Sequence, residues 1–318
     1  MRAAHYTQYG GPEVFSVVEK IKPEPAKDQI LVKVYCTTVN RTDTGMTSAM
    51  YFVSRFFTGL FKPRKNTPGT DFSGVVEQVG SEVTRFKIGD EVFGFDDNIL
   101  GSQAEYLVIQ SEGNVEHKAD NVTHQQAAAS IEGAHYALNV YRHAHVGKGQ
   151  DVLIYGATGA IGTAAVQLAK PLQVDKLHAV ANTKNLDLIK KLGAAKVYNY
   201  ETEDFTESSH QYDLVFDAVG KTSYKACKNL LKKEGVYIST ELGKNGVNIW
   251  LAMTNKQVKF PFPIGIKNSL KVVRELMQMD KFRPVIDRNY PLEDIQEAYE
   301  YVSSGKKTGN VVLEMIRE

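Results

Sequence analysis

The stretch Gly156-Ala157-Thr158-Gly159-Ala160-Ile161-Gly162 decides the fold of this chain. It follows the apolar run Asp151-Val152-Leu153-Ile154-Tyr155 and precedes a run of small, helix-forming residues from Thr163 to Lys170. A second apolar run, from Leu177 to Ala181, comes at the distance that a strand–helix–strand unit needs. Glycines between a strand and a helix let the helix N-terminus hold the pyrophosphate of a dinucleotide. Because similar glycine spacings occur in ordinary turns, the prediction of dinucleotide binding depends on the flanking strand and helix.

The residues around this unit continue its alternation of strands and helices. Thr123 and the residues after it are typical of a capped helix start, and Pro171 should end or kink the first crossover helix. Further strands are expected over residues 196–200, 212–217 and 235–240, and further helices over residues 186–192 and 224–231. Strands separated by helices predict a doubly wound parallel sheet. We therefore expect a Rossmann dinucleotide-binding domain over residues 123–283.

The first part of the chain has a different pattern, of short strands separated by glycine-containing turns. Strands are expected over residues 29–36, 73–80 and 104–109, with a turn and a short strand over residues 87–94. This pattern predicts a barrel-like β domain. The tail, with expected strands over 282–287 and 310–316 and a helix over 293–302, should return to that domain. The 318 residues thus predict two domains, the first formed by residues 1–122 and 284–318.

Composition and charge exclude several classes of protein. The net charge of +1 gives no field that would favour nucleic acid or an anionic membrane surface. No apolar run approaches the ~20 residues of a membrane span, and the first residues lack the apolar core of a secretory signal. The two cysteines, Cys36 and Cys227, are far apart in the sequence and do not suggest a disulfide framework. We expect a cytoplasmic protein with a small-molecule substrate.

Four segments of the chain resemble motifs of one enzyme family. They are Val39-Asn40-Arg41-Thr42-Asp43, Pro68 to Val76 (PGTDFSGVV), Val83 to Val92 (VTRFKIGDEV) and Gly305 to Leu313 (GKKTGNVVL). Together they resemble the zinc-free quinone oxidoreductase branch of the medium-chain dehydrogenase/reductase superfamily. The resemblance implies an α/β two-domain fold with a GroES-like β-barrel catalytic domain and a Rossmann domain. Because relatives often dimerise through the edge strand of the Rossmann sheet, it also implies a homodimer formed near residues 258–260.

The resemblance also bears on metal binding. Zinc-dependent members carry a cysteine at the position of Asn40 and a histidine at the position of Thr70, with a third ligand near Glu132. Zinc needs about four Cys, His or carboxylate ligands at convergent positions, and one carboxylate alone cannot hold it. The four clustered cysteines of the structural-zinc lobe are also missing from the sequence. We therefore expect no metal.

The choice of cofactor depends on the end of the second Rossmann strand. An NAD enzyme usually has an acidic residue there, which binds the ribose 2′-hydroxyl and would repel the 2′-phosphate of NADP. This chain instead has Asn182-Thr183-Lys184-Asn185, about twenty residues past the last glycine. Asn182 and Thr183 can donate hydrogen bonds and Lys184 carries a positive charge, although Lys184 could instead be a solvated surface lysine. The missing carboxylate favours NADPH over NADH.

The resemblance implies further contacts with the cofactor. Tyr200 stands where the resembling reductases often have a tyrosine near the adenosine phosphate. Ala218, Val219 and Gly220 close the fourth Rossmann strand, where relatives pass the backbone along the adenine ribose. Asn310 precedes the last strand, at a position where relatives have a polar residue that contacts the cofactor.

Three residues are candidates for catalysis. Asn40 stands at a metal-ligand position, so family geometry implies a place beside the nicotinamide; alternatively it forms an Asx turn after a strand. Arg41 could bind a carbonyl or anionic oxygen, or it could be a surface arginine. Tyr51 could donate a proton or stack on an aromatic substrate, or it could be a core or lid aromatic. The aromatic segment 50–61 around it fits a lid over an apolar pocket and an amphipathic helix equally well.

These expectations combine into one leading function and two alternatives. The leading one is a metal-free oxidoreductase that transfers a hydride from NADPH to a quinone or an α,β-unsaturated carbonyl, with hydrogen bonds that stabilise the developing charge. One alternative is a nucleotide-binding sensor or structural protein without turnover. The other is a zinc alcohol dehydrogenase, which Asn40 and Thr70 oppose.

Overall fold

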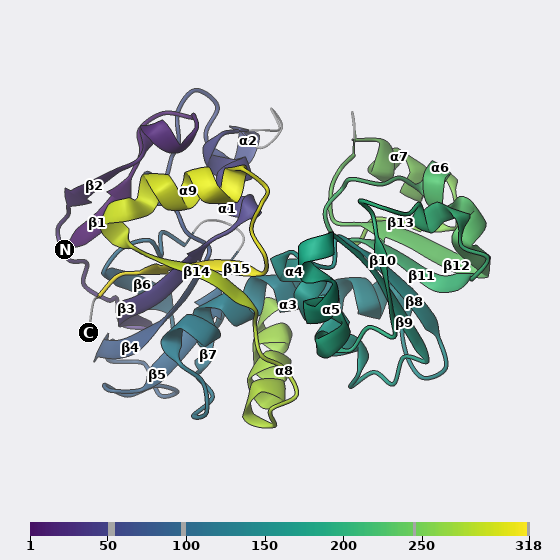
Figure 1. Cartoon of the computed structure of the whole chain (residues 1–318). Helices are drawn as coiled ribbons and strands as arrows, with labels where there is room; N and C mark the ends of the chain where they lie inside the picture. Colours follow the sequence, from purple (N-terminus) through teal and green to yellow (C-terminus); the bar gives the residue numbers. More distant parts are fainter. Residues whose placement is uncertain (50–54, 97–99, 244–245, 317–318) are drawn as a thin grey trace. The chain divides into compact units, whose positions relative to one another are not determined.

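The computed structural model of this chain describes residues 1–49, 55–96, 100–243 and 246–316 (Figure 1). By its internal contacts the chain divides into two compact units. The first unit comprises Met1–Ile131 and Ile266–Glu318, and the second comprises Glu132–Gly265. The domain boundaries expected from the sequence, after residues 122 and 283, stay a prediction. Within the described ranges, no helix combines the length and the apolar character that crossing a membrane requires.

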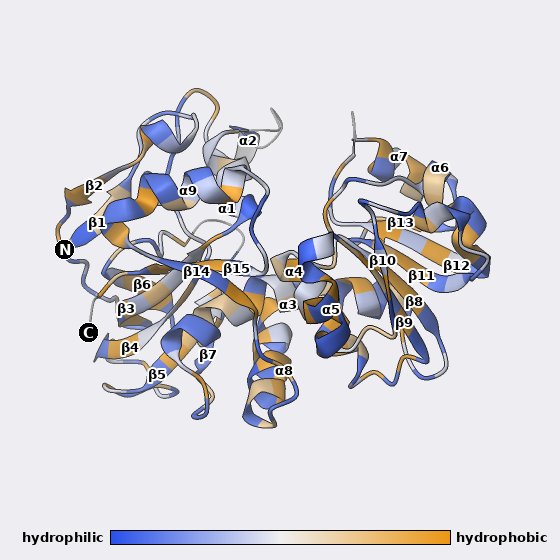
Figure 2. Ribbon diagram, viewed as in Figure 1, coloured by the Kyte–Doolittle hydropathy of each residue, from blue (hydrophilic) through white to orange (hydrophobic). Residues whose placement is uncertain are grey.

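The second unit is built on a six-stranded parallel sheet. Its order is β10 (Lys196–Asn199), β9 (Lys176–Ala181), β8 (Asp151–Tyr155), β11 (Tyr212–Asp217), β12 (Leu231–Ser239) and β13 (Val258–Lys259). The central strands β8 and β11 carry mostly hydrophobic residues (Figure 2), as strands covered on both faces do. The chain runs outward from β8 through β9 to β10, and then from β11 through β12 to β13. The order therefore reverses between β8 and β11, where sheets of this kind bind ligands.

Helices connect these strands as the alternating pattern predicts. They are α3 (His124–Ala144), α4 (Ala160–Ala169), α5 (Leu186–Leu192), α6 (Tyr224–Cys227) and α7 (Val247–Thr254), with short 3₁₀ turns η3 (Thr183–Asn185), η4 (Phe205–Glu207) and η5 (Lys228–Leu230). Thr123 caps α3, since its Oγ1 accepts from the Gln126 N–H at 3.2 Å. The helix α4 ends at Ala169, two residues before Pro171, so the expected stop is confirmed.

The helix expected over residues 224–231 is wrong at its end. Only α6 and the turn η5 form, and the strand β12 begins at Leu231, which pairs with Tyr212. Leu230 and Leu231 are both buried in the core of the second unit. Their burial favours a strand over another helical turn. The sequence does not indicate this start of the strand, because the next residues, Lys232 to Glu234, are charged.

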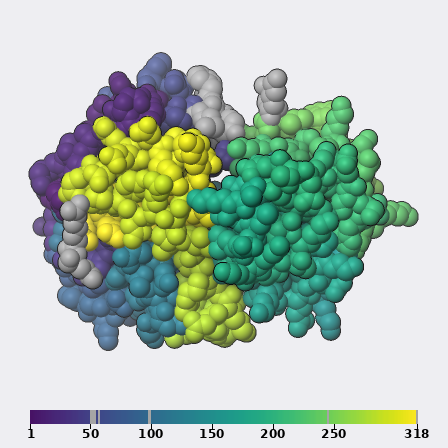
Figure 3. Space-filling view, viewed as in Figure 1, coloured from purple at the N-terminus to yellow at the C-terminus, as the bar shows by residue number. Residues whose placement is uncertain are grey.

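The first unit contains the antiparallel strands that the sequence predicts, together with one parallel pair. Its main sheet has the order β14 (Ile286–Pro291), β15 (Asn310–Glu314), β3 (Gln29–Val39), β4 (Asp71–Val79), β5 (Glu91–Phe95) and β7 (Val115–His117), and β6 (Tyr106–Gln110) also pairs with β3. A separate hairpin joins β1 (Arg2–His5) to β2 (Ser16–Glu19). Since β15 pairs with β3, the expected return of the tail to this domain is confirmed, and Figure 3 shows the tail lying against the N-terminal residues.

Helices complete the first unit around an aromatic core. They are α1 (Arg41–Thr47), α2 (Arg55–Thr58), α8 (Ile266–Gln278) and α9 (Ile295–Ser303), with 3₁₀ turns η1 (Pro12–Val14) and η7 (Leu292–Asp294). The rings of Phe15 and Tyr299 lie 4.0 Å apart between centroids, and both are buried with Tyr6 and Phe72. The strand expected over residues 282–287 is wrong at its start, since β14 begins at Ile286. Residues before it close the end of α8 instead, where the Arg283 guanidinium donates to the Met277 carbonyl.

The glycine turn between β8 and α4 has the backbone that its sequence predicts. Gly156 has φ +77°, and a Cβ there would lie 2.6 Å from Val219 Cγ1. A Cβ on Gly162 would lie 2.2 Å from the Gly156 carbonyl oxygen, so this glycine allows α4 to pack against the turn. A Cβ on Gly159 would meet only the Gly156 oxygen, at 3.9 Å, and otherwise faces open space. Gly156 and Gly162 thus shape the turn, whereas Gly159 leaves room beside it.

Two substitutions separate these roles. We expect Gly162→Ala to lower the free energy of unfolding by about 2 kcal/mol or more, because its Cβ would overlap backbone atoms. Gly159→Ala has no such overlap, and we expect it to change stability by less than about 1 kcal/mol while weakening dinucleotide binding. Urea unfolding and a nucleotide titration measure the two effects. Equal loss of stability in both variants would contradict this account of the turn.

Candidate functional site

In the second unit, Asp217 organises the loop that follows β11. Its Oδ1 accepts the N–H groups of Val219 at 3.1 Å and Gly220 at 2.8 Å. Its Oδ2 accepts the hydroxyl of Tyr237 at 3.0 Å. The side chain is fully buried, so these donors replace the water that its carboxylate would otherwise need. The expected cofactor-contact residues Ala218, Val219 and Gly220 are therefore held beside the glycine turn, where Val219 approaches Gly156.

The residues expected at the ribose end of the cofactor come from the loops after β9 and β10. Asn182 accepts a 2.8 Å hydrogen bond from the Asn185 side chain, whereas Thr183 and Lys184 are exposed. Tyr200 is 52% exposed and directly follows β10. Because Asn199 pairs with Ala181, both loops leave the sheet at the same edge as the glycine turn. The structure thus brings residues 156–162, 182–184, 200 and 218–220 to one edge of one sheet.

Glu201 also lies in this group, although no motif in the sequence marks it. Its carboxylate accepts both the N–H and the hydroxyl of Thr183. Glu201 could have been identified from the parallel pairing of β9 with β10, because that pairing places the loop after β10 beside the loop after β9.

In the first unit, Asn40 follows β3 and precedes α1, at a position fixed by hydrogen bonds. Its backbone N–H donates to Asp43 Oδ2 at 2.8 Å, which is one arm of a capping box at the start of α1. Its Nδ2 donates to Thr38 Oγ1 at 2.5 Å and to Asp71 Oδ2 at 3.1 Å. Both oxygens hold the side-chain amide nitrogen in place, and Asn40 is buried.

Asp71, the first residue of β4, is the acceptor at the centre of this arrangement. Beyond the Asn40 amide, it accepts the Thr38 N–H at 2.8 Å and the Thr38 hydroxyl at 2.5 Å. Burial raises the pKa of the Asp71 carboxyl to about 7, and the hydrogen bonds from Thr38, Thr37 and Asn40 oppose that rise. In the sequence this aspartate is only one residue of the motif PGTDFSGVV; its burial at the start of β4 is seen only in the structure.

A second polar link ties this cluster to the tail of the chain. Gln103 Nε2 donates to the Thr38 carbonyl at 3.0 Å, and the Tyr299 hydroxyl donates to Gln103 Oε1 at 3.0 Å. Since Val311 pairs with Val39, Asn310 lies at the same end of the β3–β15 pair as Asn40. The Asn310 side chain is buried, and its Nδ2 donates to the Val285 carbonyl at 3.0 Å, which holds the start of β15.

The other candidate residues of the first unit are placed as follows. Arg41 is exposed as the first residue of α1. Tyr51 lies outside the described residues, as do residues 50–54 of the aromatic segment. Thr70 donates to Asp43 Oδ1 at 3.5 Å. Within the described ranges, no three His, Cys, Asp or Glu side chains are grouped as a metal site would need, and a zinc-free centre stays a prediction.

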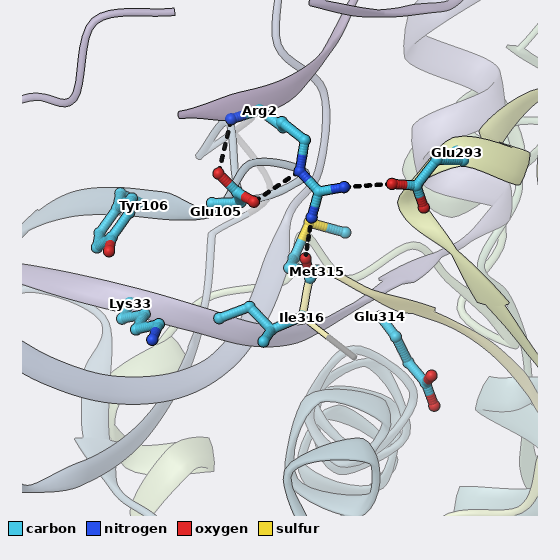
Figure 4. Close-up of a pocket in the computed structure, with 8 residues that line it drawn as sticks. All are labelled: Arg2, Lys33, Glu105, Tyr106, Glu293, Glu314, Met315 and Ile316. Atoms are coloured by element: carbon cyan, nitrogen blue, oxygen red, sulfur yellow. Dashed lines mark hydrogen bonds and ion pairs between the residues drawn. The ribbon is translucent and has the colours of Figure 1, made fainter. Parts of the chain in front are cut away.

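A pocket elsewhere in the first unit contains none of these candidates (Figure 4). Its lining residues are Arg2, Lys33, Glu105, Tyr106, Glu293, Glu314, Met315 and Ile316. The Arg2 guanidinium donates to Glu105 Oε1 at 2.7 Å, pairs with Glu293 and donates to the Met315 carbonyl at 3.3 Å. These contacts join β1 to the residue before β6 and to the tail of the chain, so Arg2 has a structural role.

The raised pKa of Asp71 predicts a pH dependence of stability. The unfolded chain releases this proton near the ordinary pKa of 3.8, whereas the folded chain retains it until the pH approaches about 7. Between these values the folded state binds more protons, so this group's contribution to stability falls as the pH rises. Asp71→Asn removes the titrating carboxyl. The free energy of unfolding of the wild type minus that of the variant should therefore become smaller as the pH rises from about 4 to about 8.

Urea unfolding at both pH values measures this difference. Asp28→Asn, which makes the same change at an exposed aspartate of the same unit, is the matched control. A difference for Asp71→Asn that varies no more with pH than that of Asp28→Asn would show that the folded state does not raise the pKa of the Asp71 carboxyl.

Comparison with known proteins is consistent with this geometry. The family model described as "Alcohol dehydrogenase GroES-like domain" matches residues 26–120, and the one described as "Zinc-binding dehydrogenase" matches residues 192–313. Together they cover the main sheet of the first unit, without the β1–β2 hairpin, and much of the parallel sheet of the second. The expected pairing of a GroES-like domain with a Rossmann-type domain is confirmed.

Individual relatives extend along the whole chain. The 2-methylene-furan-3-one reductase of Solanum lycopersicum is 32% identical over 334 residues, which cover 99% of this chain and 79% of the relative. The chloroplastic NADPH-dependent alkenal/one oxidoreductase of Arabidopsis thaliana is 30% identical over 327 residues, covering 98% of this chain and 79% of the relative. Among solved structures, the quinone oxidoreductase from Coxiella burnetii superposes with a TM-score of 0.90 at 29% identity, covering 99% of each chain.

The fold and these relatives agree with the resemblance found in the four sequence motifs. The chain is an oxidoreductase of the medium-chain dehydrogenase/reductase superfamily and belongs to its quinone oxidoreductase-like branch.

Proposed function

We propose that this chain uses NADPH, without a metal, to reduce a quinone or an α,β-unsaturated carbonyl compound. The observation that carries the proposal is the buried amide of Asn40, which Thr38 and Asp71 hold where zinc-dependent members have a metal-ligating cysteine. The names of two relatives, an alkenal/one oxidoreductase and a 2-methylene-furan-3-one reductase, support the same substrate class. Asparagine at position 40 and threonine at position 70 support the absence of catalytic zinc.

The second unit fits a dinucleotide at the glycine turn. The open space beside Gly159 would admit the pyrophosphate, and backbone N–H groups at the start of α4 would bind it. Thr183, Lys184 and Tyr200 would lie at the adenosine ribose, since they follow the second and third strands of the sheet. The Arabidopsis relative that is named NADPH-dependent supports the choice of NADPH. When bound, the reduced nicotinamide supplies the hydride.

The geometry of Asn40 restricts what it can contribute to catalysis. Its amide nitrogen is held by Thr38 and Asp71, and its Oδ1 can accept a hydrogen bond from a ligand. It would therefore orient a donor on the cofactor or the substrate. The exposed guanidinium of Arg41 is a donor suited to polarising the substrate carbonyl.

The proposed homodimer is supported by the edge of the parallel sheet. Among the described strands, β13 is the last of the sheet order. Near it in the sequence, Trp250 is 59% exposed, Met253 73% and Phe262 68%, which is an unusual set of large apolar side chains to leave in water. Light scattering would give the mass of the assembly directly. The cytoplasmic location expected from the sequence stays a prediction.

The activity is tested by following the absorbance of NADPH and of NADH while quinones and an alkenal are added in turn. We expect oxidation of NADPH in preference to NADH, with 1,4-benzoquinone, 9,10-phenanthrenequinone or the alkenal as acceptor. Tight binding of NADPH without oxidation by any acceptor would favour a sensor. Absence of nucleotide binding would overturn the proposal as a whole.

Asn40→Ala tests the residue that carries the proposal. We expect kcat/KM to fall by roughly tenfold to a hundredfold, because the reacting groups lose a positioning contact, while the Kd for NADPH changes less. Asn289→Ala, which removes an exposed hydrogen bond to Glu314 in the same unit, is the control and should leave both values unchanged. Equal activity of the two variants would contradict a role for Asn40 in the reaction.

A further inference from the structure

The loops after β9 and β10 form one continuous set of hydrogen bonds. The strands are parallel, with Asn199 opposite Ala181, so residues 182–185 and residues 200–203 leave the sheet side by side. Asn199 Nδ2 donates to Thr183 Oγ1 at 2.8 Å, and the Glu201 N–H donates to Asn199 Oδ1 at 3.1 Å. Asn199 thereby holds Thr183 and Glu201 next to each other.

Within this set, the Glu201 carboxylate takes both donors of Thr183. Its Oε2 accepts the Thr183 N–H at 3.0 Å and the Thr183 hydroxyl at 2.6 Å. The hydroxyl already accepts from Asn199, so its one proton is directed at Glu201. The hydrogen bonds from Thr183 lower the pKa of Glu201, which is therefore ionised at neutral pH.

Glu201 places a carboxylate beside the residues that follow β9, although none of those residues is acidic. In a strand–helix–strand dinucleotide site, the residues after the second strand contact the ribose, and an acidic residue there binds a 2′-hydroxyl and repels a 2′-phosphate. The four residues after β9 contain no carboxylate. Glu201 supplies one in space from the next strand, and it occupies the N–H and hydroxyl donors that a phosphate would use.

We propose that Glu201 is a specificity-determining residue that competes with the 2′-phosphate for Thr183 and thereby limits the preference for NADPH over NADH. The proposal rests on dinucleotide binding as proposed above. A 2′-phosphate has to displace the carboxylate and then lie near its negative charge, whereas a 2′-hydroxyl can donate to the carboxylate in place. The chain would accordingly accept both nucleotides, with a modest preference for NADPH.

The test compares nucleotide affinities, which do not depend on turnover. Isothermal titration gives the Kd of NADPH, NADH, 2′,5′-ADP and 5′-ADP for the wild type and for Glu201→Gln. Glu207→Gln is the matched control, because Glu207 is also an exposed residue of this unit and its loss changes the net charge equally. We expect Glu201→Gln to tighten NADPH and 2′,5′-ADP by about tenfold relative to NADH and 5′-ADP, less so at high salt.

Three outcomes are decisive. Tighter binding of the 2′-phosphorylated ligands by Glu201→Gln, but not by Glu207→Gln, supports the proposal. Unchanged affinity ratios in Glu201→Gln, with nucleotides still bound, overturn it while leaving the proposed function intact. If no variant binds any of the four ligands, the proposed function and this inference both fail. Glu201 is exposed, so we expect the variant to fold, and its thermal unfolding checks this.

Discussion

The buried carboxylate of Asp71 is the group on which the candidate site of the first unit depends. Burying a carboxylate is costly unless hydrogen bonds replace its water, and here the backbone and hydroxyl of Thr38 and the amide of Asn40 do so. These donors come from the last residues of β3 and from the residue after it. The Asp71 carboxylate thus fixes the end of β3, the residue that precedes α1 and the orientation of the Asn40 amide.

Asp217 has a comparable role in the second unit. It too stands at an end of a strand, is fully buried and gathers backbone donors from the loop beside it. One aspartate holds the Asn40 amide, and the other holds the loop that faces Gly156. In each unit a buried aspartate whose hydrogen bonds are satisfied holds an otherwise irregular segment in place, which is how a site can be organised before its ligand binds.

The elements with strong local signals could be predicted from the sequence. The glycine turn, β11 over Tyr212–Asp217 and α5 over Leu186–Leu192 agree with expectation to the residue, because each has a clear apolar run bounded by glycine or a polar stop. The end of the 224–231 helix and the start of the 282–287 strand could not be predicted, because burial of Leu231 and the contact of Arg283 with α8 decide them. The helix α8 was not expected, although Leu270, Val273 and Met277 have helical spacing.

The same distinction applies to the candidate site. Asn40 and the glycines could be predicted because motifs mark them, whereas the partner of Asn40 is 31 residues away in the sequence and is identified only by the hydrogen bond between them. Glu201 likewise needs the β9–β10 register. The residues after β9 by themselves favour NADPH, but they do not show Glu201, which the neighbouring strand β10 brings beside them.

The central claim is that an amide held by a buried aspartate stands where zinc-dependent members have a metal ligand, and that the reaction needs no metal. The most direct measurement is the zinc content of purified protein that is turning over NADPH and a quinone, before and after treatment with a chelator. The account predicts far less than one zinc per chain, about a tenth or lower, and unchanged turnover after chelation. One zinc per chain, with turnover that is lost on chelation and restored by added zinc, would contradict it.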